Sequence, residues 1–131
     1  MNRASARLIR QKGFEMAKDL NARFEKEVKS SPVVIYMKGT PDFPMCGFSR
    51  GAVEALASVG APITYVNVLE DPEAWEGIKV YSQWPTIPQI FIGGELMGGC
   101  DIVREMWQSG DLELQVKKAL EAAAAGSPAR G

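Results

Sequence analysis

Apolar side chains recur at helical and then at strand spacing in the N-terminal part of the chain. One helix face is marked at intervals of three or four residues by Ala17, Leu20, Phe24 and Val28. The sequence Ser30-Ser31-Pro32 should end this helix, because proline cannot continue it. Residues 33–37, VVIYM, then form a short apolar run rich in β-branched side chains. The pattern predicts a short amphipathic helix followed by a buried strand.

The middle of the chain continues with a helix, a strand and a second helix. From Ser49 onward, apolar residues at positions 52, 53, 56, 57 and 59 mark a helix face that ends at Gly60, where a left-handed cap is expected. Residues 63–68 alternate between apolar and polar and predict a second strand. Residues 70–83, with Pro72 near their start, predict another helix.

The C-terminal third predicts a hairpin and two helices. Residues 89–99 hold two apolar runs joined at Gly93-Gly94, which is a turn signal for an antiparallel hairpin. Helices should follow over about 101–109 and 111–124, each opening with an aspartate suited to capping it. Because the earlier strand-helix-strand unit implies a parallel crossover, the fold class is α/β, with a mixed sheet covered by helices.

Length and composition favour one domain. With 131 residues, of which 46% are apolar, the chain can bury one core but not two. We expect residues 17–125 to form this domain and residues 126–131 to be frayed. Residues 1–14 hold four basic and no acidic side chains, so residues 1–16 are either an unstructured basic tail or the remnant of an organellar presequence.

The charge is unevenly distributed along the chain. Residues 1–30 carry eight Lys or Arg against four Asp or Glu, whereas residues 31–125 carry six against twelve. An acidic body lacks the clustered basic face of a nucleic-acid-binding surface, so we expect no nucleic-acid partner. There is no run of 18 apolar residues and no signal-peptide pattern, which predicts a soluble intracellular protein without a membrane partner.

The cysteine and histidine contents exclude several kinds of site. The chain has no histidine, so a His-based catalytic triad or a His-ligated zinc site is impossible. Its two cysteines, Cys46 and Cys100, are too few for a four-thiolate site or a disulfide scaffold. A bound metal would therefore need ligands from outside the chain.

Cys46 carries the clearest chemical signal. It stands at the start of a predicted helix, where free N–H groups and the helix dipole favour the thiolate, and Lys38 adds positive charge if the loop folds back. Pro41 and Pro44 stiffen that loop. Three residues after Cys46 the chain has Ser49 where a redox pair would have its second cysteine. This leaves two reactions for Cys46, mixed disulfides with an external thiol or metal ligation.

Two further segments predict a site that supplies the external thiol. In WPTIPQ, residues 84–89, Pro88 directly precedes a strand and suggests a special turn, with a cis Ile87–Pro88 bond as one form of it. In GGCD, residues 98–101, two glycines precede a helix start, so free N–H groups can hold a carboxylate while Asp101 binds an amine. An ordinary turn with a helix cap is the alternative interpretation of GGCD.

Two lysines complete the chemistry of this site. Lys38 or Lys79 can bind a second carboxylate, so the segments together suit an extended, zwitterionic peptide. Glutathione has two carboxylates, one amine and one thiol, and it fits that description.

Three segments together resemble a known family. KGTPDFPMCGFS (38–49), WPTIPQ (84–89) and GGCD (98–101) are similar to the signature segments of single-domain monothiol glutaredoxins with a Cys-Gly-Phe-Ser active site. The resemblance runs from about Val28 to Ala122. It implies a thioredoxin-like (glutaredoxin) fold, with a four-stranded mixed sheet flanked by helices.

The resemblance also implies a bound cluster and a set of site residues. Two subunits would bridge one 2Fe-2S cluster, with Cys46 as the catalytic thiol and metal ligand of each and one glutathione thiol beside it. Cys100 is expected to contribute its backbone more than its sulfur. The residues assigned to glutathione besides Cys46 are Lys38 and Lys79 for the glycine carboxylate, Thr86, Ile87 and Pro88 for the cysteinyl segment, Gly99, Cys100 and Asp101 for the γ-glutamyl end, and Phe48 for the rim.

Two functions stay open on the sequence. In the first, the protein carries the 2Fe-2S cluster from an assembly scaffold to recipient apoproteins. In the second, it is a glutathione-dependent thiol-disulfide oxidoreductase, for which the resemblance implies weak activity at most. The implied partners are a second copy of the chain in the cluster-bound state and BolA-like proteins. The implied location is the mitochondrial matrix, with plastid or cytoplasm as alternatives.

Overall fold

The computed structural model describes residues 3–125, so the frayed tail expected over residues 126–131 lies outside the described residues. Helices and strands alternate largely as the sequence pattern predicts. In chain order the elements are α1 (Arg3–Lys29), β1 (Val33–Met37), α2 (Gly47–Ser58), β2 (Thr64–Asn67), the short 3-10 helix η1 (Val68–Glu70), α3 (Pro72–Ser82), β3 (Gln89–Ile92), β4 (Glu95–Gly98), α4 (Cys100–Ser109) and α5 (Asp111–Ala124).

The four strands form one mixed sheet in the order β2-β1-β3-β4. β1 pairs in parallel with β2 and antiparallel with β3, and β3 pairs antiparallel with β4 through the hairpin at Gly93 and Gly94. Every residue of β1 and of β3 is buried, as expected for central strands that are covered on both faces. The predicted four-stranded mixed sheet is confirmed.

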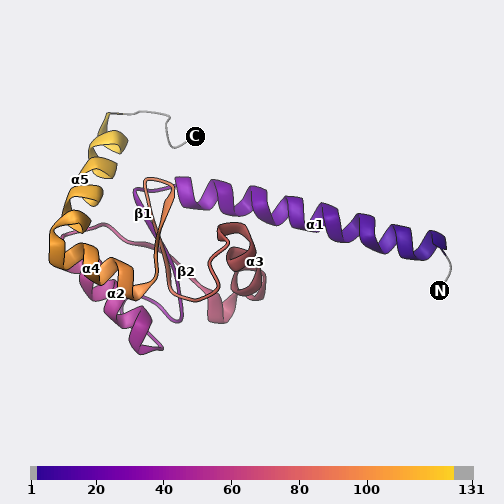
Figure 1. The fold of residues 1–131 in the computed structure, drawn as a ribbon, viewed down its shortest axis with the longest axis horizontal. Helices are drawn as coiled ribbons and strands as arrows, with labels where there is room; N and C mark the ends of the chain where they lie inside the picture. The colour runs from indigo at the N-terminus through magenta and orange to yellow at the C-terminus, as the bar shows by residue number, and fades with distance from the viewer. Residues whose placement is uncertain (1–2, 126–131) are drawn as a thin grey trace.

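Helices cover both faces of this sheet (Figure 1). Successive side chains of a strand point to opposite faces, so Val33, Ile35 and Met37 of β1 join one core with α2, α4 and α5. Val34 and Tyr36 join the other core with α1 and α3. The sheet is therefore the middle layer of three. The end of β1 and the start of β3 lie in this layer and are covered by helices on both faces.

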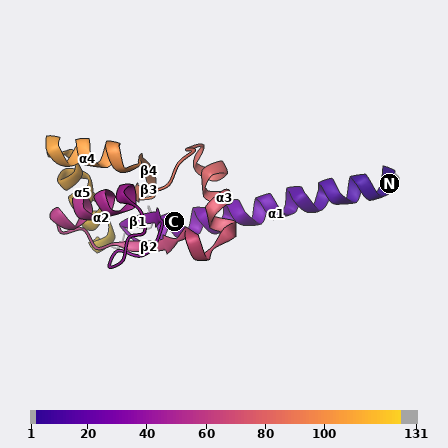
Figure 2. The same ribbon diagram turned by 90° about the horizontal axis from the view of Figure 1, so that it is seen from below.

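The first helix is longer than the apolar pattern predicts. α1 begins at Arg3 instead of near Ala17, and its N-terminal half extends away from the body (Figures 1 and 2). Residues 3–16, expected as an unstructured tail or a presequence remnant, are thus helical, and a presequence role stays a prediction. This segment contains alanine, arginine, leucine and lysine, which favour a helix even though the segment has no apolar stripe. The apolar stripe of α1 begins only where the helix reaches the sheet.

The starts of α4 and α5 also differ from the prediction. Asp101 and Asp111 lie inside the first turns, and the N-cap positions belong to Gly99 and Gly110, which have no side chain to form a cap. The two aspartates still favour these turns through the helix dipole. At the end of α2, Gly60 has a φ of +72°, and the predicted left-handed conformation is confirmed.

Candidate functional site

Cys46 is the N-cap residue of α2 and contacts Ser49 in two ways. Its Sγ accepts a hydrogen bond from the N–H of Ser49 over 3.3 Å and also lies 3.3 Å from Ser49 Oγ. Ser49 is fully buried, and its Oγ accepts the backbone N–H of Lys38 over 3.1 Å. A fixed hydroxyl therefore occupies the position where a second thiol would stand.

The loop before Cys46 is stiff. Met45 donates its N–H to the carbonyl of Lys38 over 2.9 Å, and Gly39 forms an isolated bridge with Pro44. Gly39 has a φ of +92°, and a Cβ there would lie 2.4 Å from the carbonyl oxygen of Phe43, so the turn requires glycine. The loop thus holds the thiol at a fixed place, with Lys38 nearby.

The surroundings of Cys46 favour its thiolate. Burial alone raises the pKa of this thiol, but the hydrogen bonds from the side chain of Ser49 and from the N–H groups of Ser49 and Phe48 outweigh it, helped by the charge of Lys38. The net result is a pKa below the ordinary value of cysteine, which makes Cys46 a reactive thiol.

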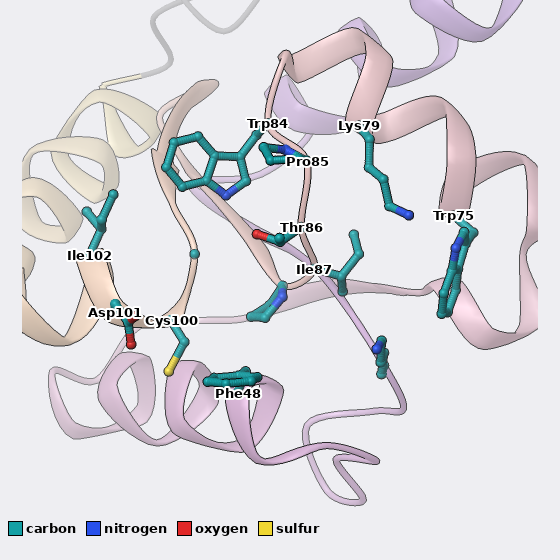
Figure 3. A pocket seen from close by; sticks show the side chains of 13 residues that line it. Phe48, Trp75, Lys79, Trp84, Pro85, Thr86, Ile87, Cys100, Asp101 and Ile102 are labelled. Carbon is teal, nitrogen blue, oxygen red and sulfur yellow. The ribbon is translucent and has the colours of Figure 1, made fainter.

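A pocket of about 490 Å³ is lined in part by Phe48, two residues after Cys46 (Figure 3). It gathers residues from the end of β1, from α2, α3 and α4, and from the loop before β3. Nine of the ten residues expected at the glutathione site line it; Cys46 is the exception, and its neighbour along α2, Phe48, reaches the pocket. Their role in binding stays a prediction. The nine residues are Lys38, Phe48, Lys79, Thr86, Ile87, Pro88, Gly99, Cys100 and Asp101.

One end of the pocket carries two ammonium groups against one indole ring. The Nζ of Lys38 lies 5.3 Å, and the Nζ of Lys79 lies 5.1 Å, from the ring centroid of Trp75. Trp75 and Lys79 are one helical turn apart on α3 and so share a face. The sequence interpretation missed Trp75, although its spacing from Lys79 signalled that both side chains point the same way.

The opposite end of the pocket is the N-terminus of α4 (Figure 3). The first N–H groups of a helix have no partner within it, and here they belong to the segment around Cys100 and Asp101. Cys100 is only 7% exposed, and burial raises the pKa of its thiol against the opposing charge of Arg104. A Cβ on Gly51 would lie 2.9 Å from its Sγ. Cys100 is therefore a closely packed thiol with a raised pKa, in contrast to the lowered pKa of Cys46.

The loop between α3 and β3 forms the wall between these two ends. Its Ile87–Pro88 bond is cis, the form of turn that the sequence suggested. Gln89 is fully buried, and its Nε2 donates to the carbonyls of Trp84 over 2.9 Å and of Thr86 over 3.2 Å. The side-chain amide of Gln89 thus holds this loop in place through two hydrogen bonds.

The described residues limit what the site can bind without help. Within residues 3–125, no three Cys, Asp or Glu side chains cluster as metal ligands, so a metal at Cys46 needs donors from outside the chain. Over the same range, none of the helices has the length and apolar character needed to cross a membrane. The site therefore combines one activated thiol with a pocket that has two cations at one end and a helix N-terminus at the other.

The chain has clear relatives among known proteins. A family model described as Glutaredoxin matches residues 33–97. Over 113 residues the chain is 45% identical to the mitochondrial monothiol glutaredoxin-5 of Saccharomyces cerevisiae, and the match covers 84% of this chain and 75% of that protein. The chain belongs to the monothiol glutaredoxins.

Two further comparisons extend this match. The chain is 50% identical over 101 residues to the chloroplastic monothiol glutaredoxin-S14 of Arabidopsis thaliana, covering 77% of this chain but 58% of that glutaredoxin. The solution structure of reduced poplar apo GrxS14, also 50% identical, superposes with a TM-score of 0.68 and covers 77% of this chain and 93% of that chain. The predicted thioredoxin-like glutaredoxin fold is confirmed.

Proposed function

We propose that this monothiol glutaredoxin carries a 2Fe-2S cluster and transfers it to recipient apoproteins. Each of two subunits would supply the Cys46 thiolate, and one glutathione on each subunit would supply the other two thiolates that the cluster needs. The observation that best supports this is the pairing of an activated Cys46 with the buried hydroxyl of Ser49, next to a peptide-sized pocket. This turn of α2 holds one thiol, and the pocket has room for a ligand that brings another.

Glutathione matches the two charged ends of the pocket. Its glycine carboxylate would lie at Lys38 and Lys79, and its γ-glutamyl carboxylate at the free N–H groups of α4, with the amine at Asp101. The cysteinyl backbone would pair with residues 86–88, and its thiol would then be directed toward Cys46. Four separate polar features of the pocket would thus each have a partner on one small peptide.

An exposed apolar rim around Cys46 supports contact with a second subunit. Phe43, Met45 and Phe48 are 75%, 66% and 65% exposed, and they lie in the loop and the first turn on either side of the thiol. Clustered apolar side chains on a surface are typical of interaction sites. A second copy on this rim would bring its own Cys46 and glutathione to the same cluster. BolA-like proteins, which the resemblance implies, would replace one subunit there.

Anaerobic reconstitution with iron, sulfide and glutathione tests the proposal. We expect the wild-type chain to form a brown dimer with one iron per chain, and Cys46→Ser or omission of glutathione to give colourless protein. Cys100→Ser, which leaves its backbone in place, is the matched control and should keep most of the colour. A colourless wild-type monomer would contradict the carrier function.

A second candidate, a glutathione-dependent thiol-disulfide oxidoreductase, is favoured by the lowered pKa of Cys46. The Cys46 thiolate would attack a protein–glutathione disulfide, release the protein thiolate and form a Cys46–glutathione disulfide. A second glutathione thiolate would then restore Cys46 and leave as glutathione disulfide. Colourless protein that turns over a glutathionylated substrate would favour this enzyme, whose activity should be weak.

We also propose a location in the mitochondrial matrix, with plastid or cytoplasm as alternatives. Residues 1–14 hold four basic and no acidic side chains, and the relatives described above are named mitochondrial and chloroplastic. Fractionation of cells that make the chain with a C-terminal tag tests this location, and recovery in the cytosolic fraction alone would contradict it.

A further inference from the structure

The two ammonium groups at one end of the pocket come from different elements. Lys38 follows β1 and Lys79 lies on α3, yet their Nζ atoms lie 5.3 Å and 5.1 Å from the centroid of one ring, Trp75. Like charges repel, so placing both beside one ring is favoured by a group that attracts each of them. The electron-rich face of an indole is such a group.

The indole of Trp75 is itself held in place. Trp75 is partly buried and packs against the core that α1 and α3 form on one face of the sheet. Its helix starts at a side-chain cap, because Oδ1 of Asp71 accepts the N–H of Ala74 over 3.1 Å. The ring is therefore a fixed surface, whereas a lysine side chain alone has many rotamers.

Neither lysine is neutralised within the described part of the chain. Among residues 3–125, no carboxylate lies within salt-bridge distance of the Nζ of Lys38 or Lys79. Lys38 also lies near the Cys46 thiolate, but neither lysine has a carboxylate partner among these residues, and this favours an external carboxylate at the pair. Figure 3 shows Lys79 directed into the space in front of Trp75.

We propose that Trp75 is a positioning residue, whose indole holds the ammonium groups of Lys38 and Lys79 together so that both bind one carboxylate of the peptide thiol. This inference rests on the proposed function, because that carboxylate is the glycine carboxylate of bound glutathione. Trp75 acts through the lysines and needs no contact with the ligand. Without the ring, the ligand would have to order both lysine side chains on binding, which weakens its affinity.

The experiment compares glutathione with glutathione amide, whose glycine carboxylate is neutralised. Isothermal titration calorimetry of both ligands is carried out on the wild-type chain, Trp75→Leu and Trp75→Phe. We expect Trp75→Leu to weaken glutathione binding roughly three- to tenfold, with little change for the amide. Trp75→Phe keeps an aromatic ring and should retain most of the preference for glutathione. In the Lys38→Met/Lys79→Met double variant, adding Trp75→Leu should cause no further loss.

Three results would overturn the role of Trp75: an equal loss for both ligands in Trp75→Leu, an unchanged preference for glutathione in that variant, or a wild-type chain that binds both ligands equally. If Trp75→Leu does not fold, the NMR chemical shifts of the ε-methylene protons of Lys38 and Lys79 in the wild-type chain provide the test instead. Upfield ring-current shifts support the inference, and random-coil shifts overturn it. A wild-type chain that binds neither ligand contradicts the proposed function itself, which separates the two failures.

Discussion

Ser49 Oγ lies 3.3 Å from Cys46 Sγ while accepting the backbone N–H of Lys38 over 3.1 Å. A hydroxyl that already accepts one hydrogen bond can still donate its own hydrogen, and the sulfur of Cys46 is its neighbour. The position of a second cysteine is therefore used to stabilise negative charge on the first.

Replacing Ser49 by alanine should raise the pKa of Cys46, because the hydrogen bond from its side chain is the largest contribution that lowers this pKa. The pH dependence of Cys46 alkylation by iodoacetamide measures the change. Ser58→Ala removes a hydroxyl from the same helix, where it donates to the carbonyl of Glu54, and serves as the control. An alkylation profile that Ser49→Ala leaves unmoved would show that the hydroxyl does not stabilise the thiolate.

Gln89 should determine both the stability of the pocket wall and ligand binding. Gln89→Leu removes two donors, so the carbonyls of Trp84 and Thr86 lose their partner. We expect a loss of about 1–3 kcal/mol in the free energy of unfolding, together with weaker glutathione binding. Urea denaturation and calorimetry measure the two effects. Gln115→Leu, on α5, is the control, and equal effects of the two variants would argue against a special role for Gln89.

Arg23 links α1 to α3. It donates from Nη1 to Asp71 over 3.3 Å and from Nε to Glu27 over 3.0 Å. Arg23→Met should lower the free energy of unfolding by about 1 kcal/mol at neutral pH, since the charge-assisted bonds are partly screened by water. The hydrogen bond from Arg23 is the largest cause of the lowered pKa of Asp71. Asp71 therefore contributes stability above about pH 4, and this stability is lost as the pH falls through the lowered folded value.

The effect of Arg23→Met should accordingly shrink in acid. Urea denaturation at neutral pH and at about pH 3 measures this difference. Lys29→Met, which breaks an exposed pair with Glu25, is the control and should change stability less. A loss of equal size at both pH values would show that the Asp71 carboxylate is not the partner that matters.

The apolar rim around Cys46 should control dimer formation without changing the pocket. Phe43→Glu combined with Met45→Glu places two negative charges on each subunit at the proposed contact, where they repel each other. We expect reconstituted protein of this variant to stay monomeric in size-exclusion chromatography while glutathione still binds. Leu114→Glu, at an apolar side chain on α5 that is 48% exposed, is the matched control. A cluster-bound dimer of normal stability in the double variant would place the contact elsewhere.

Local patterns predict the fold where one signal dominates. The buried run 33–37 has no alternative to a central strand, and Gly93-Gly94 determines the hairpin that follows β3. Residues 3–16 gave no such signal, because their helix depends on composition and has no apolar stripe facing the body. The capping prediction failed at Asp101 and Asp111, because a glycine precedes each of them and takes the N-cap position.

The site was predictable to the extent that its chemistry lies in contiguous segments. The segments around Cys46, Pro88 and Asp101 carry their own signatures, and the structure brings them to one pocket. Trp75 carries none, because its role depends on Lys38, which is far away in the sequence and reaches the ring only through packing of α3 against the sheet. Contacts of this kind become visible only in three dimensions.

The central claim is that glutathione provides the thiolates that the chain itself lacks. Native mass spectrometry of the reconstituted protein counts them directly. We predict a species of two chains, one 2Fe-2S cluster and two glutathiones, which is absent from Cys46→Ser. A cluster-bound dimer without glutathione, or a cluster on a single chain, would contradict this claim.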